Sequence, residues 1–236
     1  MKTAFLVDGE FYLKRIRKIA PARAADPEKV ARTLLWASLQ HLRKLNRGQE
    51  SLYRIFFYDC PPMDRVLHNP LATRGYNYQK TDSAQFRLAV HDALRKQRKV
   101  ALRLGRMAPH GSWHIREDKL KALLRGQIQV GDIVESDLFY DCRQKEVDMK
   151  IGLDIASLAY NGMVDQIILI SGDSDFVPAA KLARREGIDF ILDPMWNQIN
   201  SNLHEHIDGL QSPWPNPNGN RTRGGRQTRE EASSAP

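Results

Sequence analysis

The stretch Ile167 to Val177 reads I-I-L-I-S-G-D-S-D-F-V, and it decides the fold. Four apolar residues run straight into a Ser-Gly-Asp-Ser-Asp segment, and a helical pattern follows. A short apolar run between helical patterns is typical of a buried strand in a parallel sheet. In such sheets the loops after the carboxyl ends of the strands form the binding crevice. We therefore expect Asp173 and Asp175 to lie at a crevice of an α/β fold.

A second apolar run, Thr3 to Val7, also ends at an aspartate, Asp8. Farther along, Asp26-Pro27-Glu28 has the residue types of a helix start, and Leu52 to Tyr58 is the next apolar run, closed by Asp59. A strand, a helix and a second strand in this order predict two parallel strands with a right-handed crossover.

The rest of the chain continues the alternation. We expect helices over 83–99, 117–125, 145–161, 176–187 and 200–207, strands over 100–104, 113–115, 137–140 and 188–192, and a long loop over 60–81. This alternation predicts a mostly parallel central sheet with helices on both faces. Residues 1–211 would form one domain, and residues 212–236, rich in Arg, Pro and Gly, a disordered tail.

Composition narrows the function classes. The 236 residues carry a net charge of +8, which favours polyanionic partners, although solubility explains net charge alone equally well. Two cysteines are too few for a disulfide framework or a cysteine-rich zinc site, so a reduced, cytoplasmic setting is the simplest account. Only a few apolar residues precede Asp8, too few for a signal peptide or a membrane span.

Four aspartates are the candidate catalytic and metal-ligating residues: Asp8, Asp148, Asp173 and Asp175. Each alone has an ordinary explanation as a turn, a helix cap or a charge at a helix N-terminus. Two like charges about 4 Å apart repel by roughly 4 kcal/mol at an effective dielectric of 20, so a cluster requires bound cations or protonation. Carboxylate and water oxygens suit Mg²⁺ or Mn²⁺, and the seven histidines are too scattered to suggest zinc.

Metal-bound aspartates in a basic chain suggest phosphodiester hydrolysis. Basic residues from Lys14 to Lys18 and from Ser83 to Arg106 would hold the flanking phosphates. The second run is as easily explained as a solvated helix face.

Three motifs resemble those of the NYN domain family, in the LabA-like branch of the PIN-like nucleases. They are V-D-G at Val7 to Gly9, K-E-V-D-M-K-I-G-L-D at Lys145 to Asp154, and L-I-S-G-D-S-D-F-V-P at Leu169 to Pro178. The resemblance spans roughly Thr3 to Leu192. It implies a PIN-like α/β sandwich and a Mg²⁺- or Mn²⁺-dependent ribonuclease acting on single-stranded RNA. It also implies metal binding by the four aspartates, with Asp154 and Ser171 as supporting residues.

One departure from the family pattern leaves an alternative open. The family usually continues D-G-x-N, and Phe11 stands at the Asn position. A catalytically weak or inactive RNA-binding module is therefore the second hypothesis, with Glu10 as a substitute ligand under the first. A phosphatase is disfavoured because Asp8-Gly9-Glu10 lacks the D-x-D pair that supplies the nucleophile. An enzyme with a nucleotide cofactor is disfavoured because no Walker A or G-x-G-x-x-G motif follows a strand. A homodimer is compatible with the sequence.

Overall fold

The structure, a computed structural model, describes residues 1–44, 51–72, 75–108 and 110–217. Its centre is a six-stranded sheet in the order β12-β11-β10-β1-β2-β5, in which every neighbouring pair is parallel. The strands are β1 (Lys2–Asp8), β2 (Ser51–Asp59), β5 (Val100–Leu104), β10 (Gln166–Ile170), β11 (Asp189–Asp193) and β12 (Gly209–Leu210). The predicted α/β fold with a parallel central sheet is confirmed.

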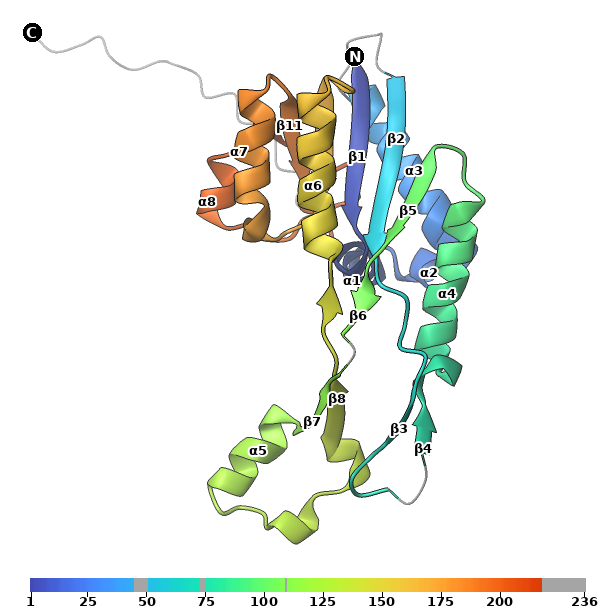
Figure 1. Cartoon of the computed structure of the whole chain (residues 1–236), viewed down its shortest axis with the longest axis vertical. Helices are drawn as coiled ribbons and strands as arrows, with labels where there is room; N and C mark the ends of the chain where they lie inside the picture. Colours follow the sequence, from blue (N-terminus) through green and yellow to red (C-terminus); the bar gives the residue numbers. More distant parts are fainter. Residues whose placement is uncertain (45–50, 73–74, 109, 218–236) are drawn as a thin grey trace, which may run out of the picture.

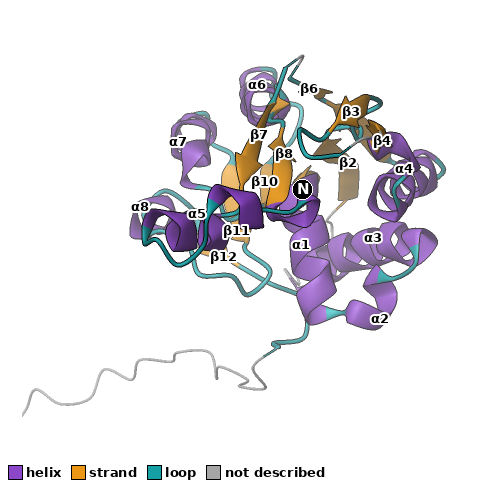
Figure 2. Cartoon of the chain, turned by 90° about the horizontal axis from the view of Figure 1, so that it is seen from below, coloured by secondary structure: helices purple, strands orange, loops and turns teal. Residues whose placement is uncertain are grey.

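Helices cover both faces of this sheet (Figure 2). One face carries α1 (Gly9–Ile19), α2 (Pro21–Ala24), α3 (Pro27–Lys44) and α4 (Asp82–Arg95), and the other carries α6 (Val147–Tyr160), α7 (Val177–Arg185) and α8 (Ser201–His204). The alternation of β1 explains this arrangement: Ala4 and Leu6 belong to the core under α6 and α7, whereas Phe5 and Val7 belong to the core under α1, α3 and α4. All four are fully buried.

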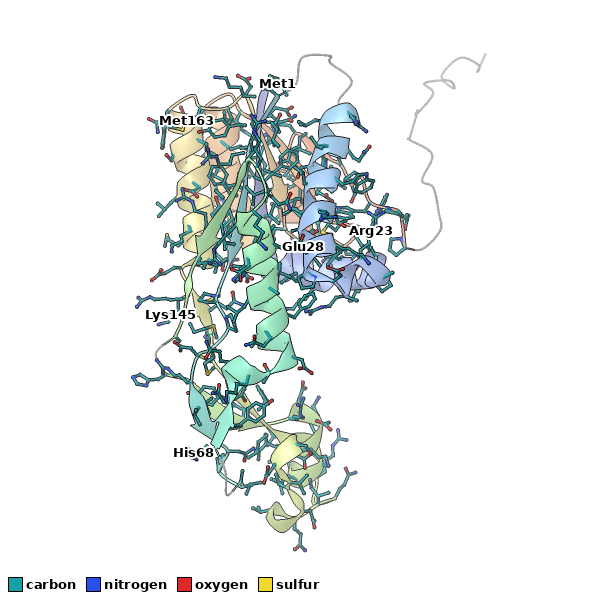
Figure 3. All side chains as sticks on the ribbon, turned by 90° about the vertical axis from the view of Figure 1, so that its right-hand side faces the viewer. Met1, Arg23, Glu28, His68, Lys145 and Met163 are labelled. Atoms are coloured by element: carbon teal, nitrogen blue, oxygen red, sulfur yellow. The ribbon has the colours of Figure 1, made fainter. Side chains whose placement is uncertain are left out.

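A second body, which we call the arm, projects beyond the carboxyl ends of the strands (Figure 1). It consists of residues 61–81 and 105–145. Its antiparallel pairs are β3 (Val66–His68) with β4 (Gly75–Asn77), β6 (Arg106–Met107) with β9 (Gln144–Lys145), and β7 (Ser112–Ile115) with β8 (Leu138–Asp141), and α5 (Glu117–Leu124) follows β7. Figure 3 places Lys145 at the base of the arm and His68 near its far end.

The arm corrects one expectation. Residues 60–81 are not a plain loop over the sheet edge, because Val66–His68 and Gly75–Asn77 form a hairpin followed by a 3₁₀ turn at Tyr78–Lys80. Strands of three residues are too short to show a period-two pattern in the sequence. The short strands expected over 113–115 and 137–140 are present as β7 and β8, and the structure pairs them with each other in antiparallel order.

Several element ends also differ from expectation. The helix expected to begin at 145 begins at Val147, because Glu146 has a left-handed backbone with φ of 74°. The helix expected to reach 99 ends at Arg95, and Lys99 has φ of 64° just before β5. The helix that starts at Asp26-Pro27-Glu28 is expected to end at Gly48, which lies outside the described residues, as do residues 218–236 of the expected tail.

The last described residues pack on the domain. Trp214 is almost fully buried, and its Nε1 donates to Asp193 at 3.1 Å, as does the Ser212 hydroxyl at 2.7 Å. These contacts lie beyond the expected boundary at residue 211. Within the described part of the chain, no helix is both long enough and apolar enough to cross a membrane.

Candidate active site

Asp8 ends β1 and caps the helix that follows. Its Oδ1 accepts from the Phe11 backbone N–H at 3.1 Å, so the carboxylate is fixed at the N-terminus of α1. Gly9 allows this sharp passage from strand to helix, since a Cβ there would lie 2.6 Å from the Tyr58 carbonyl oxygen. The other carboxylate oxygen, Oδ2, is 3.4 Å from the hydroxyl of Ser171.

Asp173 and Asp175 follow the neighbouring strand. Val7 of β1 pairs with Ile170 of β10, so the loop after β10 begins beside Asp8. Ser171 is buried, and its Oγ also accepts from the Asp173 backbone N–H at 3.3 Å. Asp173 in turn caps the 3₁₀ turn Ser174–Phe176 by accepting from the Asp175 N–H at 3.0 Å. Asp173, rather than Asp175, is therefore the capping residue of this segment.

Asp148 lies in the first turn of α6, three residues after the arm returns through β9. Glu146 precedes it and forms ion pairs with Arg106, in β6, and with Lys150, one helical turn later. The pKa of Glu146 is accordingly lowered, first of all by the Arg106 hydrogen bond. Asp148 itself is exposed. The base of the arm thus forms one wall of the site.

The charges of the four aspartates are linked, because some of them affect the pKa of others. The pKa of Asp8 is raised to about 6, mainly because its carboxyl is buried, and further by Asp148, Glu10 and Asp59. The pKa of Asp148 is also raised, by partial burial first and then by Asp173 and Asp175. The structure therefore brings together side chains from β1, α6 and the loop after β10.

A small pocket of about 230 Å³ lies between β1 and α6, and we call it the acid pocket. Its lining residues are Asp8, Glu10, Gln144, Glu146, Val147, Asp148 and Met149. Glu10 accepts from the Gln144 side chain at 2.6 Å and pairs with Lys14 at 2.8 Å. Asp173 and Asp175 are outside this lining. Gln144 and Glu146 were not expected here. Glu146 belongs to the K-E-V-D motif and Gln144 directly precedes it, and this position is the sequence signal that could have indicated them.

The donor set fits a hard divalent cation by its chemistry, since every candidate ligand atom is a carboxylate oxygen. Among the described residues, however, no group of three or more His, Cys, Asp or Glu side chains is already arranged to hold a metal ion. The four aspartates would therefore have to move closer together around an ion. The raised pKa values of Asp8 and Asp148 come first from burial and then from the neighbouring acids.

Asp154, expected near this site, has other partners. It accepts from the Tyr58 hydroxyl at 2.7 Å and pairs with Arg103, with Nε 3.1 Å from Oδ2. Burial, followed by this hydrogen bond, raises the pKa of Tyr58 far above its usual range. Six residues separate Asp154 from Asp148 along α6, which is about 9 Å of helix.

Two further strand-end aspartates are sequestered by histidines. Asp59, at the end of β2, lies 2.7 Å from Nε2 of His91, and Asp193, at the end of β11, lies 2.9 Å from Nε2 of His41. All four side chains are fully buried. At the carboxyl edge of the sheet, Asp8 at the end of β1 lines the acid pocket, whereas Asp59 and Asp193, at the ends of the strands β2 and β11, are buried against histidines.

Many of the expected phosphate contacts are engaged elsewhere. Arg87 pairs with Asp59, Arg103 with Asp154 and Arg106 with Glu146. Arg15 donates to the Met195 carbonyl oxygen, with Nε at 3.0 Å. The basic run of residues 83–106 thus contributes mostly internal ion pairs.

Phe11 packs on the loop after β10. A Cβ on Gly172 would lie 2.8 Å from the Phe11 ring, so glycine is required for this contact. The apolar ring of Phe11 therefore covers the loop after β10, whereas the family pattern D-G-x-N would place the polar amide of an asparagine at this position.

Part of the chain matches a known protein family. Residues 90–205 match the family model of the NYN domain, a range that includes Asp148, Asp173 and Asp175 and lies after Asp8. NYN domains are PIN-like nuclease-type domains, and the match supports the NYN family and a nuclease role.

A crystal structure of a protein of unknown function from Vibrio parahaemolyticus is similar over 89% of this chain and 90% of that one, with 16% identity and a TM-score of 0.42. No curated protein sequence matches the chain.

Proposed function

We propose, on the premise of the NYN match over residues 90–205, that this chain is a Mg²⁺- or Mn²⁺-dependent endoribonuclease of the LabA-like branch, acting in the cytoplasm. The observation that carries the proposal is the convergence of Asp8, Asp148, Asp173 and Asp175. The carboxylates come from three separate elements: Asp148 helps to raise the pKa of Asp8, and Asp173 and Asp175 help to raise the pKa of Asp148. A purely structural role would not require such repulsion at one edge of the sheet.

The four aspartates would hold the cation, with Glu10 as a further oxygen donor. A bound divalent ion supplies a more acidic water and neutralises charge on the phosphate oxygens. The chain's own residues prepare the site for it: Phe11 N–H and Ser171 Oγ fix the two oxygens of Asp8. Asp8 must release its proton before it can bind a cation, so a pKa of about 6 predicts loss of metal binding in acid.

The test is cleavage of single-stranded RNA by purified protein with Mn²⁺, with Mg²⁺ and with excess EDTA. Asp173→Asn should abolish cleavage without unfolding the protein. Asp92→Asn is the matched control, because Asp92 is an exposed aspartate that pairs only with Arg95 among the described residues. Equal cleavage by the wild type and Asp173→Asn would refute the assignment of the site.

One observation favours the second candidate, an RNA-binding module with weak or no cleavage. Phe11 covers Gly172 where the family pattern has Asn. If this ring limits activity, Phe11→Asn should raise the cleavage rate with Mn²⁺, and Phe11→Leu should not. Salt-dependent RNA binding without any metal-dependent product, in the wild type and in Phe11→Asn alike, would support the binding module instead.

A further inference from the structure

A hollow of the arm lies between the β3–β4 and β7–β8 hairpins, and it shares no lining residue with the acid pocket. It has a volume of about 730 Å³, within the range of ligand pockets. Tyr76 and Tyr78 line it from the β4 side, and Trp113, Arg116 and Leu138 line it from the β7–β8 side. Two segments distant in sequence thus present aromatic rings to a common space.

The three rings differ in exposure: Tyr78 and Trp113 are half-buried, and Tyr76 is exposed. Tyr76 is 53% exposed although it lies edge-on to Tyr78, with ring centroids 5.0 Å apart. Trp113 is held in place by Tyr140, at 5.4 Å between centroids. Arg116 is fixed by its Nε, which donates to the Ser136 carbonyl oxygen at 2.9 Å. Rigid rings beside a fixed guanidinium can stack on a flat, polar ligand.

The same tyrosines form the wall of a second hollow of about 460 Å³ on the side of the domain. Its basic lining residues are Arg17, near the end of α1, and Arg87 of α4. Asp8 caps the other end of α1, and nine residues of helix separate Asp8 from Arg17, about 14 Å along the axis. Aromatic and basic surfaces therefore extend from the arm toward the acid pocket.

We infer that the hollow between the hairpins is a binding site for an unpaired nucleobase of the RNA, stacked against Tyr76 and Trp113. This inference rests on the proposed function, since it takes RNA as the substrate. Stacking on aromatic rings accepts any base, and a base can enter the hollow only if it is free of a partner strand. The arm thus selects single-stranded RNA.

The experiment measures binding without cleavage. A fluorescein-labelled oligouridylate is titrated in EDTA, and its anisotropy gives Kd for the wild type and the variants. Tyr76→Leu and Trp113→Leu should each weaken binding by about tenfold, whereas Tyr76→Phe should retain wild-type affinity. Phe139→Leu is the matched control: Phe139 is an exposed ring of the same hairpin that packs on His114 and is outside the hollow.

A second probe locates the base. Replacing one uridine by an abasic residue should weaken wild-type binding but should not weaken Tyr76→Leu further. Thermal unfolding of each variant verifies that the fold is kept. Unchanged Kd values for both leucine variants, equal loss in Phe139→Leu, or no binding of the oligouridylate would overturn the inference.

The two proposals can fail separately. If the wild type binds in a Tyr76-dependent way but releases no product with Mn²⁺, the ribonuclease proposal fails and the base site stands. If cleavage requires Asp173 but binding is indifferent to Tyr76, the base site fails and the ribonuclease proposal stands.

Discussion

The hydroxyl oxygen of Ser171 lies 3.4 Å from Oδ2 of Asp8 and so joins the ends of two neighbouring strands that are 163 residues apart in the chain. The same hydroxyl accepts from the Asp173 backbone N–H at 3.3 Å. One buried side chain therefore positions the carboxylate after β1 and the loop that carries the two aspartates after β10.

Ser171→Ala should loosen this junction. We expect a loss of about 1 kcal/mol in the free energy of unfolding, the usual value of a hydrogen bond, because the Asp173 N–H loses its acceptor. Cleavage should fall more steeply than stability, since Asp8 and Asp173 would no longer be held together. Urea unfolding and RNA cleavage would measure the two effects. Ser157→Ala, at a serine of α6 remote from this junction, is the control; parallel losses in both variants would contradict the prediction.

Asp8 predicts a pH dependence of stability in the absence of metal. Its pKa is about 6 in the folded protein, above its ordinary value of 3.8, so between these values the folded state binds the proton and the unfolded state does not. The free energy of unfolding should therefore fall as pH rises from about 4 to 6, by at most about 3 kcal/mol, and then level off.

Asp8→Asn should remove this dependence. Asparagine keeps the N-cap of α1 but carries no charge, so the variant should be more stable than the wild type above pH 6 in EDTA. Urea unfolding from pH 4 to 8 is the measurement. If both proteins show the same pH profile, Asp8 does not titrate as proposed. Added Mn²⁺ should stabilise only the wild type.

Asp154 should be a structural residue. Asp154→Ala removes the acceptor of the Tyr58 hydroxyl and the partner of Arg103, and we expect a loss of about 1–3 kcal/mol in the free energy of unfolding. Mn²⁺ affinity, measured by calorimetry on the folded variant, should be unchanged. A tenfold or larger loss of affinity, about 1.4 kcal/mol, would instead place Asp154 in the metal site. Asp92→Ala, which removes an exposed ion pair, should cost less than about 1 kcal/mol.

Two glycines should respond in opposite ways to alanine. A Cβ on Gly9 would lie 2.6 Å from the Tyr58 carbonyl oxygen and 2.7 Å from the Phe57 ring, so Gly9→Ala should destabilise the protein by about 1–3 kcal/mol. At Gly152, within α6, an added methyl group would meet no described heavy atom within 4 Å outside its own helix turn, so Gly152→Ala should stabilise by about 0.5–1 kcal/mol. Thermal unfolding distinguishes the two signs. Stabilisation by Gly9→Ala would show that the turn after β1 has room to relax.

Much of the fold was readable from local patterns. The apolar runs that became β1, β10 and β11 are continuous in sequence, because both faces of the sheet are buried there, whereas Arg54 and Arg103 interrupt the runs of β2 and β5. The arm was harder to predict. Its strands are two to four residues long, and β6 and β9 are paired across an intervening segment that no local period reveals.

The sequence by itself determined that aspartates stand at the ends of parallel strands, since an apolar run followed by Asp is a local property. Only the tertiary structure decided which of them remain available. Asp59 and Asp193 each meet a buried histidine, His91 and His41, that is 32 and 152 residues away. Asp8 instead meets Ser171, Glu10 and the start of α6. The reason is physical: a carboxylate's exposure and pKa depend on which distant side chains pack around it, and sequence periodicity carries no record of those partners.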